Sequence, residues 1–331
     1  MKVPDFWYDQ EASLLSNFLG PVGWIYGFIS TIRQDRAKPW QATIPIICIG
    51  NLVAGGQGKT PTALSIGNAL KAHGKSIHFI SRGYGGSIRK LVLVDPYTHS
   101  AKEVGDEPLL LAQIAPTWIS ANRKIGIEAA CKAGAEIIVM DDGFQNPSVI
   151  KNLGIIVIDG ETGFGNGRLI PAGPLRENIP AGLSRAQAVI IIGKDPFDLK
   201  NTISNLAKKI LQKPINIFAA SLLPNDVAAK LKNTKVFAFA GIGRPEKFFT
   251  TLREIGVELV GTKAFTDHHP YSKKEINHLL QLAKRKKAIL VTTTKDHVRL
   301  PIEQKKDVRT VSVTLDWTDT NALDKLIKPF I

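Results

Sequence analysis

Cysteine is scarce in this chain, and histidine patterns typical of metal binding are missing. Two of the 331 residues are cysteines, Cys48 and Cys131, and no C-x-x-C pair occurs. The seven histidines show no zinc-like spacing. These absences argue against a disulfide framework and a structural zinc site, and they indicate a reducing compartment.

Acidic residues are also in deficit. The chain has 29 Asp and Glu against 43 Lys and Arg, which gives a net charge of +14 and a pI near 9.7. Such a charge favours a polyanionic partner, which could be nucleic acid, an anionic lipid surface or a phosphorylated substrate. Aromatic residues do not alternate with basic ones as a base-stacking platform requires. We therefore rank lipid and phosphate first and expect no nucleic-acid partner.

Residues 12–32 carry no charge. Apolar side chains recur there every three or four positions, with small or weakly polar residues between them. Because Gly20-Pro21 interrupts the run, the pattern predicts two short interfacial helices. One membrane-spanning helix and a helix packed on its own domain are the alternatives. The basic residues that follow suit lipid headgroups, so residues 1–40 are predicted to associate with an anionic membrane surface.

The most informative stretch is Ile44 to Thr62, IPIICIGNLVAGGQGKTPT. It reads as a buried strand, a glycine-rich turn and a helix from Gly58 to about Gly74. This is the arrangement of a phosphate-binding loop, in which backbone N–H groups and the helix N-terminus hold phosphate oxygens. The predicted nucleotide-binding residues are Val53, Ala54, Gly55, Gly56, Gln57, Gly58, Lys59 and Thr60.

The loop departs from the two common patterns. Val53 stands where GxxxxGK[ST] has its first glycine, and Ala54 stands where a related ATPase variant has a lysine. Lys59 is still expected to reach the β- and γ-phosphates of ATP, and the Thr60 hydroxyl to ligate Mg²⁺.

After this loop the chain alternates strand-like and helix-like segments, which predicts an α/β fold with a doubly wound parallel sheet of the P-loop NTPase type. Residues 41–150 are assigned to this core domain. A second, smaller α/β domain is predicted for residues 151–331, beginning near Lys151. Its last ~25 residues could instead pack back on the core.

Acidic residues follow one of the core strands. The strand Ile137 to Met140 ends in Asp141-Asp142, where a Mg²⁺-binding aspartate is expected beside a phosphate loop. Asp106 is predicted to cap a helix that runs to about Ile114. Asp267-His268-His269 is either functional or simply exposed. Thr294-Lys295-Asp296 weakly resembles the base-reading element of GTPases.

Seven clusters in matching order resemble the tetraacyldisaccharide 4'-kinase family. They are GNLVAGGQGKTP (50–61), SRGYGG (81–86), VGDEP (104–108), DDGFQ (141–145), PAGPLRE (171–177), FTDHH (265–269) and TTKD (293–296). The resemblance implies transfer of the ATP γ-phosphate to the 4'-hydroxyl of tetraacyldisaccharide 1-phosphate, which gives lipid IVA in lipid A biosynthesis. It also implies the cytoplasmic face of a Gram-negative inner membrane.

The same resemblance implies roles for particular residues. Asp106 would be the general base, with His268 as its partner. Lys59 would hold phosphate, while Thr60 with Asp141 or Asp142 would organise Mg²⁺ and Glu177 would complete the metal shell. Candidate phosphate or substrate clamps are Arg82, Arg123 and Arg176, although an arginine after a strand is as often a surface residue.

Two positions depart from the family pattern, and three other classes of function are alternatives. Asn146 replaces a frequent histidine, and Thr294 replaces a frequent glutamate. A membrane-associated regulatory ATPase or GTPase would hydrolyse nucleotide without a lipid acceptor. A non-catalytic adaptor is disfavoured because all four of its expected catalytic residues are present, namely Lys59, Thr60, Asp106 and Asp141. A nucleic-acid ATPase is supported by charge alone.

Overall fold

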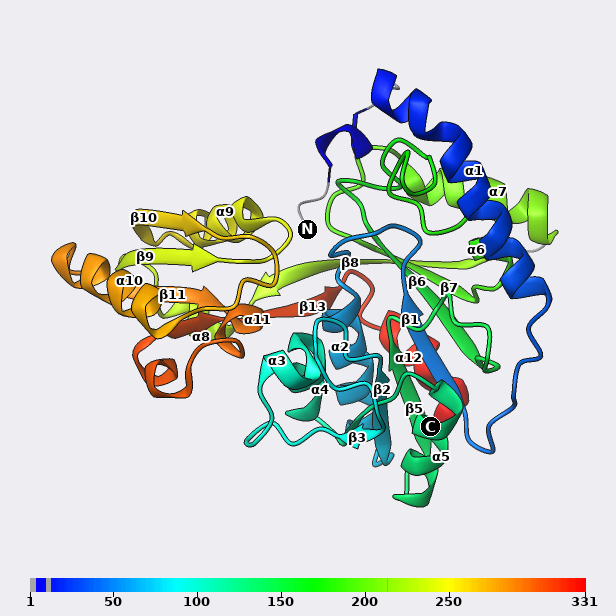
Figure 1. Ribbon diagram of the computed structural model, residues 1–331, viewed down its shortest axis with the longest axis horizontal. Helices are drawn as coiled ribbons and strands as arrows, with labels where there is room; N and C mark the ends of the chain where they lie inside the picture. Colours follow the sequence, from blue (N-terminus) through cyan, green and yellow to red (C-terminus); the bar gives the residue numbers. More distant parts are fainter. Residues whose placement is uncertain (1–3, 10–12, 213) are drawn as a thin grey trace.

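The computed structural model describes residues 4–9, 13–212 and 214–331. Parts of the predicted membrane-associating segment, residues 1–3 and 10–12, therefore lie outside the described residues. The chain forms a large lobe around a nine-stranded sheet and a smaller lobe around a four-stranded sheet (Figure 1).

The large sheet has the order β13-β8-β7-β6-β1-β5-β2-β4-β3. Its pairs are parallel from β8 to β4, and the edge strands β13 and β3 run antiparallel. The strands are β1 (Ile46–Gly50), β2 (Ile77–Ser81), β3 (Val92–Leu93), β4 (Thr117–Ile119), β5 (Ile137–Asp141), β6 (Leu153–Asp159), β7 (Ala188–Ile192), β8 (Asn216–Pro224) and β13 (Val313–Trp317).

Helices cover both faces of this sheet. One face packs against α2 (Lys59–Ala72), α4 (Asp106–Ala112) and α12 (Ala322–Ile327). The other packs against α5 (Arg123–Lys132), α6 (Ile179–Ser184) and α7 (Leu199–Leu211). The central strands are buried on both faces and are rich in Ile and Val, as parallel strands require. The predicted doubly wound α/β fold is confirmed.

The large sheet does not end at Lys151, where a domain boundary was predicted. Strands β6, β7 and β8 all lie beyond that residue and continue the sheet that contains β1. The prediction was wrong because a strand without its own phosphate loop resembles the start of a new domain, although it pairs with the strand that precedes the loop. The smaller sheet begins only at Lys235.

The four-stranded sheet has the order β10-β9-β11-β12, with all its pairs parallel. Its strands are β9 (Lys235–Ala240), β10 (Glu258–Ala264), β11 (Ile289–Thr293) and β12 (Arg309–Val311). The longer helices of this lobe are α9 (Pro245–Ile255) and α10 (Lys273–Arg285). The remaining short helices of the chain are η1 (Asp5–Trp7), α3 (Ala101–Val104), α8 (Asp226–Ala229), α11 (Thr294–His297), η2 (Ile302–Asp307) and η3 (Lys328–Phe330).

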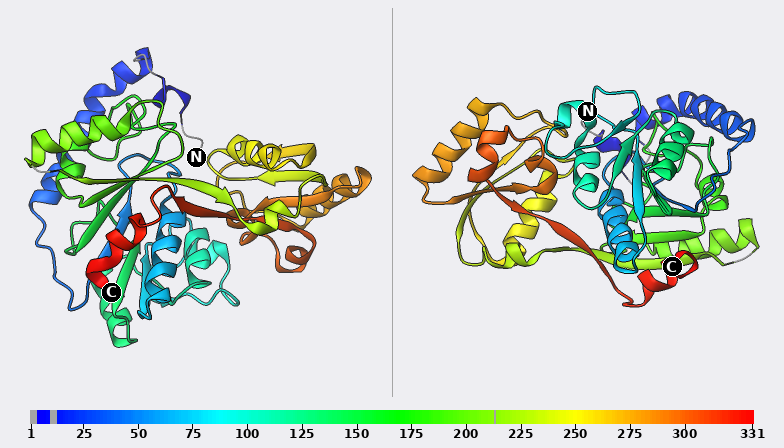
Figure 2. Two further views of the ribbon diagram at one scale, coloured as in Figure 1. Left: turned by 180° about the vertical axis from the view of Figure 1, so that it is seen from behind. Right: turned by 90° about the horizontal axis from the view of Figure 1, so that it is seen from below.

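The C-terminal residues return to the large lobe, in agreement with the predicted alternative that they pack back on the core. Strand β13 pairs antiparallel with β8, and the two strands run side by side between the lobes (Figures 1 and 2). Trp317 at the end of β13 donates from Nε1 to Ser65 Oγ of α2 at 3.0 Å. The smaller lobe is therefore inserted between two strands of the large sheet.

Helix α1 (Leu14–Asp35) is one continuous helix with Pro21 inside it. The predicted break at Gly20-Pro21 is wrong because residues on both sides of the proline are held by the same loop, residues 168–172. Ser16 Oγ donates to Ala172 O at 2.7 Å, and Gly23 packs on Leu169. This support compensates for the hydrogen bond that proline cannot donate.

The orientation of α1 is unusual, because its small face points inward. Ser16, Gly23 and Gly27 are buried against the large lobe. The large apolar side chains stand exposed on the outside of the molecule, including Leu14, Phe18, Val22, Trp24, Ile25, Phe28 and Ile29. Among the described helices, none has the length and apolarity that crossing a membrane would need.

The packing of α1 on the loop can be tested with two glycines of the same helix. A Cβ at Gly23 would lie 3.0 Å from Leu169 O, whereas a Cβ at Gly20 would come no nearer than 4.0 Å to Arg168 Nη1. Glycine to alanine normally stabilises a helix by about 1 kcal/mol. We expect Gly20→Ala to slow amide hydrogen exchange in α1 and Gly23→Ala to accelerate it. Equal exchange in both variants would show that α1 does not rest on this loop.

Candidate active site

The glycine-rich turn has the backbone that a phosphate loop needs at two positions. Gly55 and Gly58 adopt φ of +112° and +85°, in the region that favours glycine. Gly58 caps α2, and a Cβ there would meet Ile192 Cδ1 at 2.5 Å. Gly56 has open space where a Cβ would be. The turn therefore leaves room for a ligand at the N-terminus of α2.

The two residues that depart from the common loop patterns face another part of the protein. Val53 is buried and bridges to Leu175, and Ala54 N–H donates to Pro174 O at 2.8 Å. Their packing against residues 174–175 explains why neither position needs glycine or lysine. It also engages the Ala54 N–H, which cannot then hold phosphate. Gln57 is buried, and its Oε1 accepts from Asp159 N at 2.7 Å.

Asp141 lies at the end of β5 beside the first turn of α2. Thr60 Oγ1 donates to its Oδ2 at 3.0 Å, while its buried Oδ1 has no partner among the described residues. Burial raises the pKa of Asp141 to about 7, although the nearby Lys59 ammonium opposes the shift. A hydroxyl beside a carboxylate oxygen without a partner is a donor set that fits Mg²⁺.

Asp142, the next residue, binds cations instead. Arg176 Nη1 lies 2.8 Å from its Oδ1, and Lys59 Nζ lies 3.8 Å from the same oxygen. Burial favours the neutral acid, yet Lys59 and Arg176 together hold the pKa of Asp142 below its usual range. Burial lowers the pKa of Lys59. The two adjacent carboxyls therefore have different surroundings, with Asp141 paired to the hydroxyl and Asp142 to the cations.

Three other predicted residues are not brought to this pair. Glu177 is buried between Arg185 Nη2 at 2.5 Å and Gln145 Nε2 at 3.1 Å. Arg123 is buried and donates to Ser120 O. Arg82 is exposed. Of the three arginines predicted as clamps, the described contacts place Arg176 on the acidic pair.

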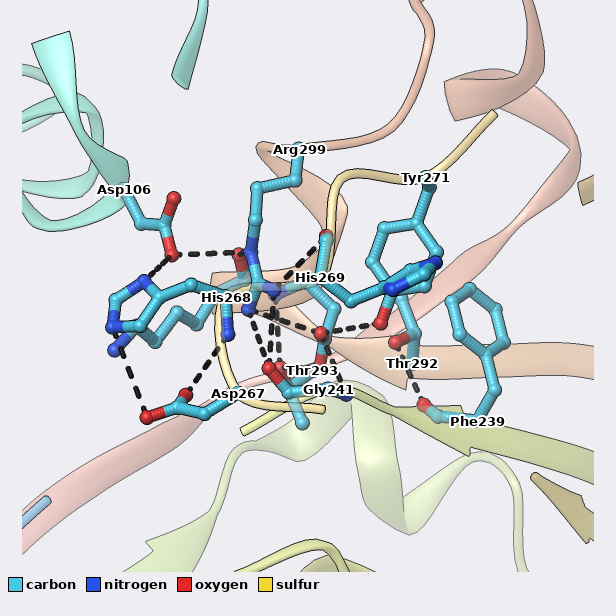
Figure 3. Close-up of polar contacts among 12 residues, drawn as sticks. Asp106, Phe239, Gly241, Asp267, His268, His269, Tyr271, Thr292, Thr293 and Arg299 are labelled. Carbon is cyan, nitrogen blue, oxygen red and sulfur yellow. Dashed lines mark hydrogen bonds and ion pairs between the residues drawn. The ribbon is translucent and has the colours of Figure 1, made fainter. Parts of the chain in front are cut away.

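Asp106 and His268 meet where the two lobes join, as Figure 3 shows. His268 Nδ1 lies 2.8 Å from Asp106 Oδ2, and Asp106 is 4% exposed. Asp106 is the first residue of α4, and Gly105 holds the N-cap position, so the predicted capping role of Asp106 was wrong. The carboxylate is thus free to contact the smaller lobe.

Residues beyond β11 complete this cluster, and sequence reasoning missed their part in it. Arg299 Nε lies 3.1 Å from Asp106 Oδ2, and Lys295 Nζ lies 2.7 Å from Glu107 Oε1. Asp296 is fully buried, and its two oxygens contact Tyr271, Arg299 and Thr293. Because Asp296 is fully buried among these partners, a nucleotide base has no access to it, and the likeness to a GTPase base-reading element does not hold. The i,i+3 spacing of Asp296 and Arg299 was the available signal.

Electrostatics link the two clusters. Burial lowers the pKa of Lys59 and raises that of Asp141, and the charge of Glu107, next to Asp106, acts on both groups as a smaller contribution. Lys59 begins α2 and Asp106 begins α4, and these two helices pack in the same core of the large lobe. Such a site can hold a charged phosphate and place a carboxylate beside an incoming hydroxyl.

Comparison with known proteins identifies the family. Residues 15–331 match the family described as Tetraacyldisaccharide-1-P 4'-kinase. The chain belongs to the tetraacyldisaccharide 4'-kinase family. Curated tetraacyldisaccharide 4'-kinases of Rhodospirillum centenum and Rhodospirillum rubrum are 45% and 47% identical to it, covering 100% of this chain and 97% and 98% of theirs.

A solved structure shares the fold of this family member. It is LpxK from Aquifex aeolicus in complex with ATP, with a TM-score of 0.74 at 24% identity, covering 96% of this chain and 99% of that one. Membership of the family confirms the prediction of an ATP-dependent kinase in lipid A biosynthesis. It disfavours the regulatory ATPase or GTPase.

The environment of Asp141 predicts how stability depends on pH without metal. Its folded-state pKa of about 7 exceeds the ordinary 3.8. Between these two pH values the folded chain therefore keeps a proton on Asp141 that the unfolded chain has lost. This stabilisation is complete below pH 3.8 and is lost as pH rises through about 7. In EDTA, we expect wild type to lose roughly 2 to 3 kcal/mol of unfolding free energy relative to Asp141→Asn between pH 5 and pH 8. Urea unfolding at both pH values measures it, and a constant difference would contradict the raised pKa.

Proposed function

We propose that this chain transfers the γ-phosphate of ATP to the 4'-hydroxyl of tetraacyldisaccharide 1-phosphate, giving lipid IVA. One observation carries the proposal: the buried Asp106 carboxylate, paired with His268, begins a helix that packs against α2, whose first residue is Lys59. A sugar hydroxyl is a poor nucleophile at neutral pH, so transfer needs both a base and neutralised phosphates. The site has residues for both tasks.

The phosphates would be held by the loop. The N–H groups at the start of α2 and the Lys59 ammonium would oppose the charge that builds up on the γ-phosphate, and Gly56 in the preceding turn has open space where a Cβ would be. Arg176 neutralises Asp142, so that this carboxylate does not repel ATP. These groups fix the phosphate chain for in-line attack.

Thr60 and Asp141 are the residues that would hold Mg²⁺. The unpartnered Asp141 oxygen and the Thr60 hydroxyl fit the ion, and Mg²⁺ would then neutralise charge on the β- and γ-phosphates. Glu177 is paired with Arg185, which leaves Asp141 the better supported ligand.

Asp106 would act as general base. Its Oδ2 is held by His268 and Arg299, so Oδ1 accepts the proton of the 4'-hydroxyl as that oxygen forms its bond to phosphorus. The bond between the γ-phosphorus and the bridging oxygen breaks, and ADP leaves with the electron pair. His268 orients the carboxylate and can carry the proton onward.

Helix α1 would bind the enzyme to the anionic surface of the inner membrane, which supplies the lipid substrate. Its exposed apolar face suits the interface, and Arg33, Arg36 and Lys38 follow at its end. The enzyme would lie on the cytoplasmic face as a peripheral or monotopic protein, where ATP is available.

The reaction can be tested with γ-labelled ATP and tetraacyldisaccharide 1-phosphate in mixed micelles. We expect wild type to label the lipid. Asp106→Asn should lower turnover about 10²- to 10⁴-fold with nearly unchanged ATP affinity, since it removes the base alone. Lys59→Ala should weaken ATP binding and turnover together. The exposed Asp316→Asn and Lys132→Ala are matched controls.

Two results would count against the proposal. ATP hydrolysis by wild type without lipid labelling would favour the regulatory ATPase. Wild-type turnover with unchanged pH dependence in Asp106→Asn would remove Asp106 as base while leaving the reaction intact.

Membrane binding can be measured by co-sedimentation with vesicles of phosphatidylglycerol and phosphatidylcholine. Replacing both Phe18 and Trp24 by serine should lower the partition coefficient more than tenfold. Burying each of these side chains in the interface contributes about 1.5 to 3 kcal/mol to the free energy of membrane binding. Tyr97→Ser, at an equally exposed aromatic outside α1, is the control. Equal binding by all three proteins would show that α1 is not the membrane contact.

A further inference from the structure

The guanidinium of Arg299 contacts four different segments. Its Nε donates to Lys295 O at 3.2 Å and pairs with Asp106 Oδ2 at 3.1 Å. Its Nη atoms donate to Gly241 O at 3.0 Å and to His269 O at 3.3 Å, and pair with Asp296 Oδ1 at 3.0 Å. The cation thus joins the start of α4 in the large lobe to three segments of the smaller lobe (Figure 3).

These contacts reach both members of the Asp106–His268 pair. Arg299 touches Asp106 directly, and it binds the carbonyl of His269, the residue after His268. Gly241 O, which accepts from both Nη atoms, also accepts from His268 N at 3.1 Å. His268 has φ of +57°, so its backbone needs such support.

Arg299 is itself held in place. Its side chain is 4% exposed, and Asp296 opposite it is fully buried. Tyr271 donates to Asp296 at 2.7 Å, and burial raises the pKa of this phenol, so that it stays a donor. A buried ion pair with satisfied partners fixes geometry more than it adds stability.

The position of Asp106 follows from this clamp. Its Oδ2 is occupied by His268 and Arg299, whereas Oδ1 makes no hydrogen bond or ion pair among the described residues (Figure 3). A carboxylate without the clamp could rotate and present either oxygen. The fixed orientation leaves one oxygen to receive a hydroxyl proton.

We propose that Arg299 is a positioning residue that sets the Asp106 carboxylate and the loop of His268 in their reactive arrangement. The inference rests on the proposed function, because it assigns Arg299 a role through the base of that reaction. Lysine would keep the charge but not the planar fork that reaches all four segments. Charge alone therefore cannot replace Arg299.

The test uses the full chain in the lipid-labelling assay. Arg299→Lys should lower kcat about 10- to 100-fold, because a displacement of about 1 Å in a catalytic group can cost 10²-fold. The KM for ATP should stay within about twofold, since the phosphate loop is untouched. Arg253→Lys, an exposed arginine of the same lobe, is the matched control, and the Tm of each variant reports folding.

A double-mutant cycle separates positioning from a structural role. If Arg299 acts through Asp106, Arg299→Lys should cause no further loss of kcat in the Asp106→Asn background. A further tenfold loss there, or wild-type kcat in Arg299→Lys, would overturn the inference. Absence of lipid labelling by wild type would instead refute the proposed function.

Tyr271→Phe tests the same support if Arg299→Lys lowers the folded fraction. It removes the phenol that holds Asp296 and leaves the guanidinium in place. We expect kcat to fall about threefold or more with the KM for ATP unchanged. Unchanged kcat in this variant would contradict the clamp.

Discussion

Strand β1 pairs in parallel with β5 on one side and β6 on the other, and the site depends on this pairing. Parallel strands end at the same edge of a sheet, so the phosphate loop after β1 and the aspartates after β5 lie beside each other. The pairing also brings Asp159, at the end of β6, to Gln57 of the loop. The topology therefore gathers the glycine-rich turn and these acidic residues at one edge of the sheet, where the proposed nucleotide site lies.

Charge pairing then determines how the site is assembled. The acidic residues around it are buried or half-buried, and each has a cation or donor close by: Thr60 for Asp141, Arg176 for Asp142, Lys295 for Glu107, and His268 with Arg299 for Asp106. Buried charges without such partners would cost several kcal/mol each. Two of the pairings cross between the lobes, so the smaller lobe completes the site as well as packing against it.

Helix α1 on the surface of the large lobe packs in an unusual way. Helix α1 buries small residues and exposes large apolar ones, the reverse of a helix on a soluble domain. Close approach to the loop at 168–172 needs Ser16, Gly23 and Gly27, because larger side chains would meet Leu169 or Ala172. As a result of this packing, the large apolar side chains of α1 point outward, where an interface with lipid would cover them.

The sequence by itself determined the local features. A strand, a glycine turn and Gly58-Lys59-Thr60 specify the phosphate loop through backbone geometry, and apolar runs ending in Asp141-Asp142 specify the neighbouring strand. The motifs also identified Asp106 and His268. Tertiary structure decided what depends on distant pairing. Strands β6 to β8 belong to the first sheet and not to a second domain. Pro21 lies within one helix because Ser16 and Gly23 pack on the same loop. Arg299 of the smaller lobe contacts Asp106 of the large lobe. Such contacts join residues far apart in the chain, and local patterns do not encode which of them meet.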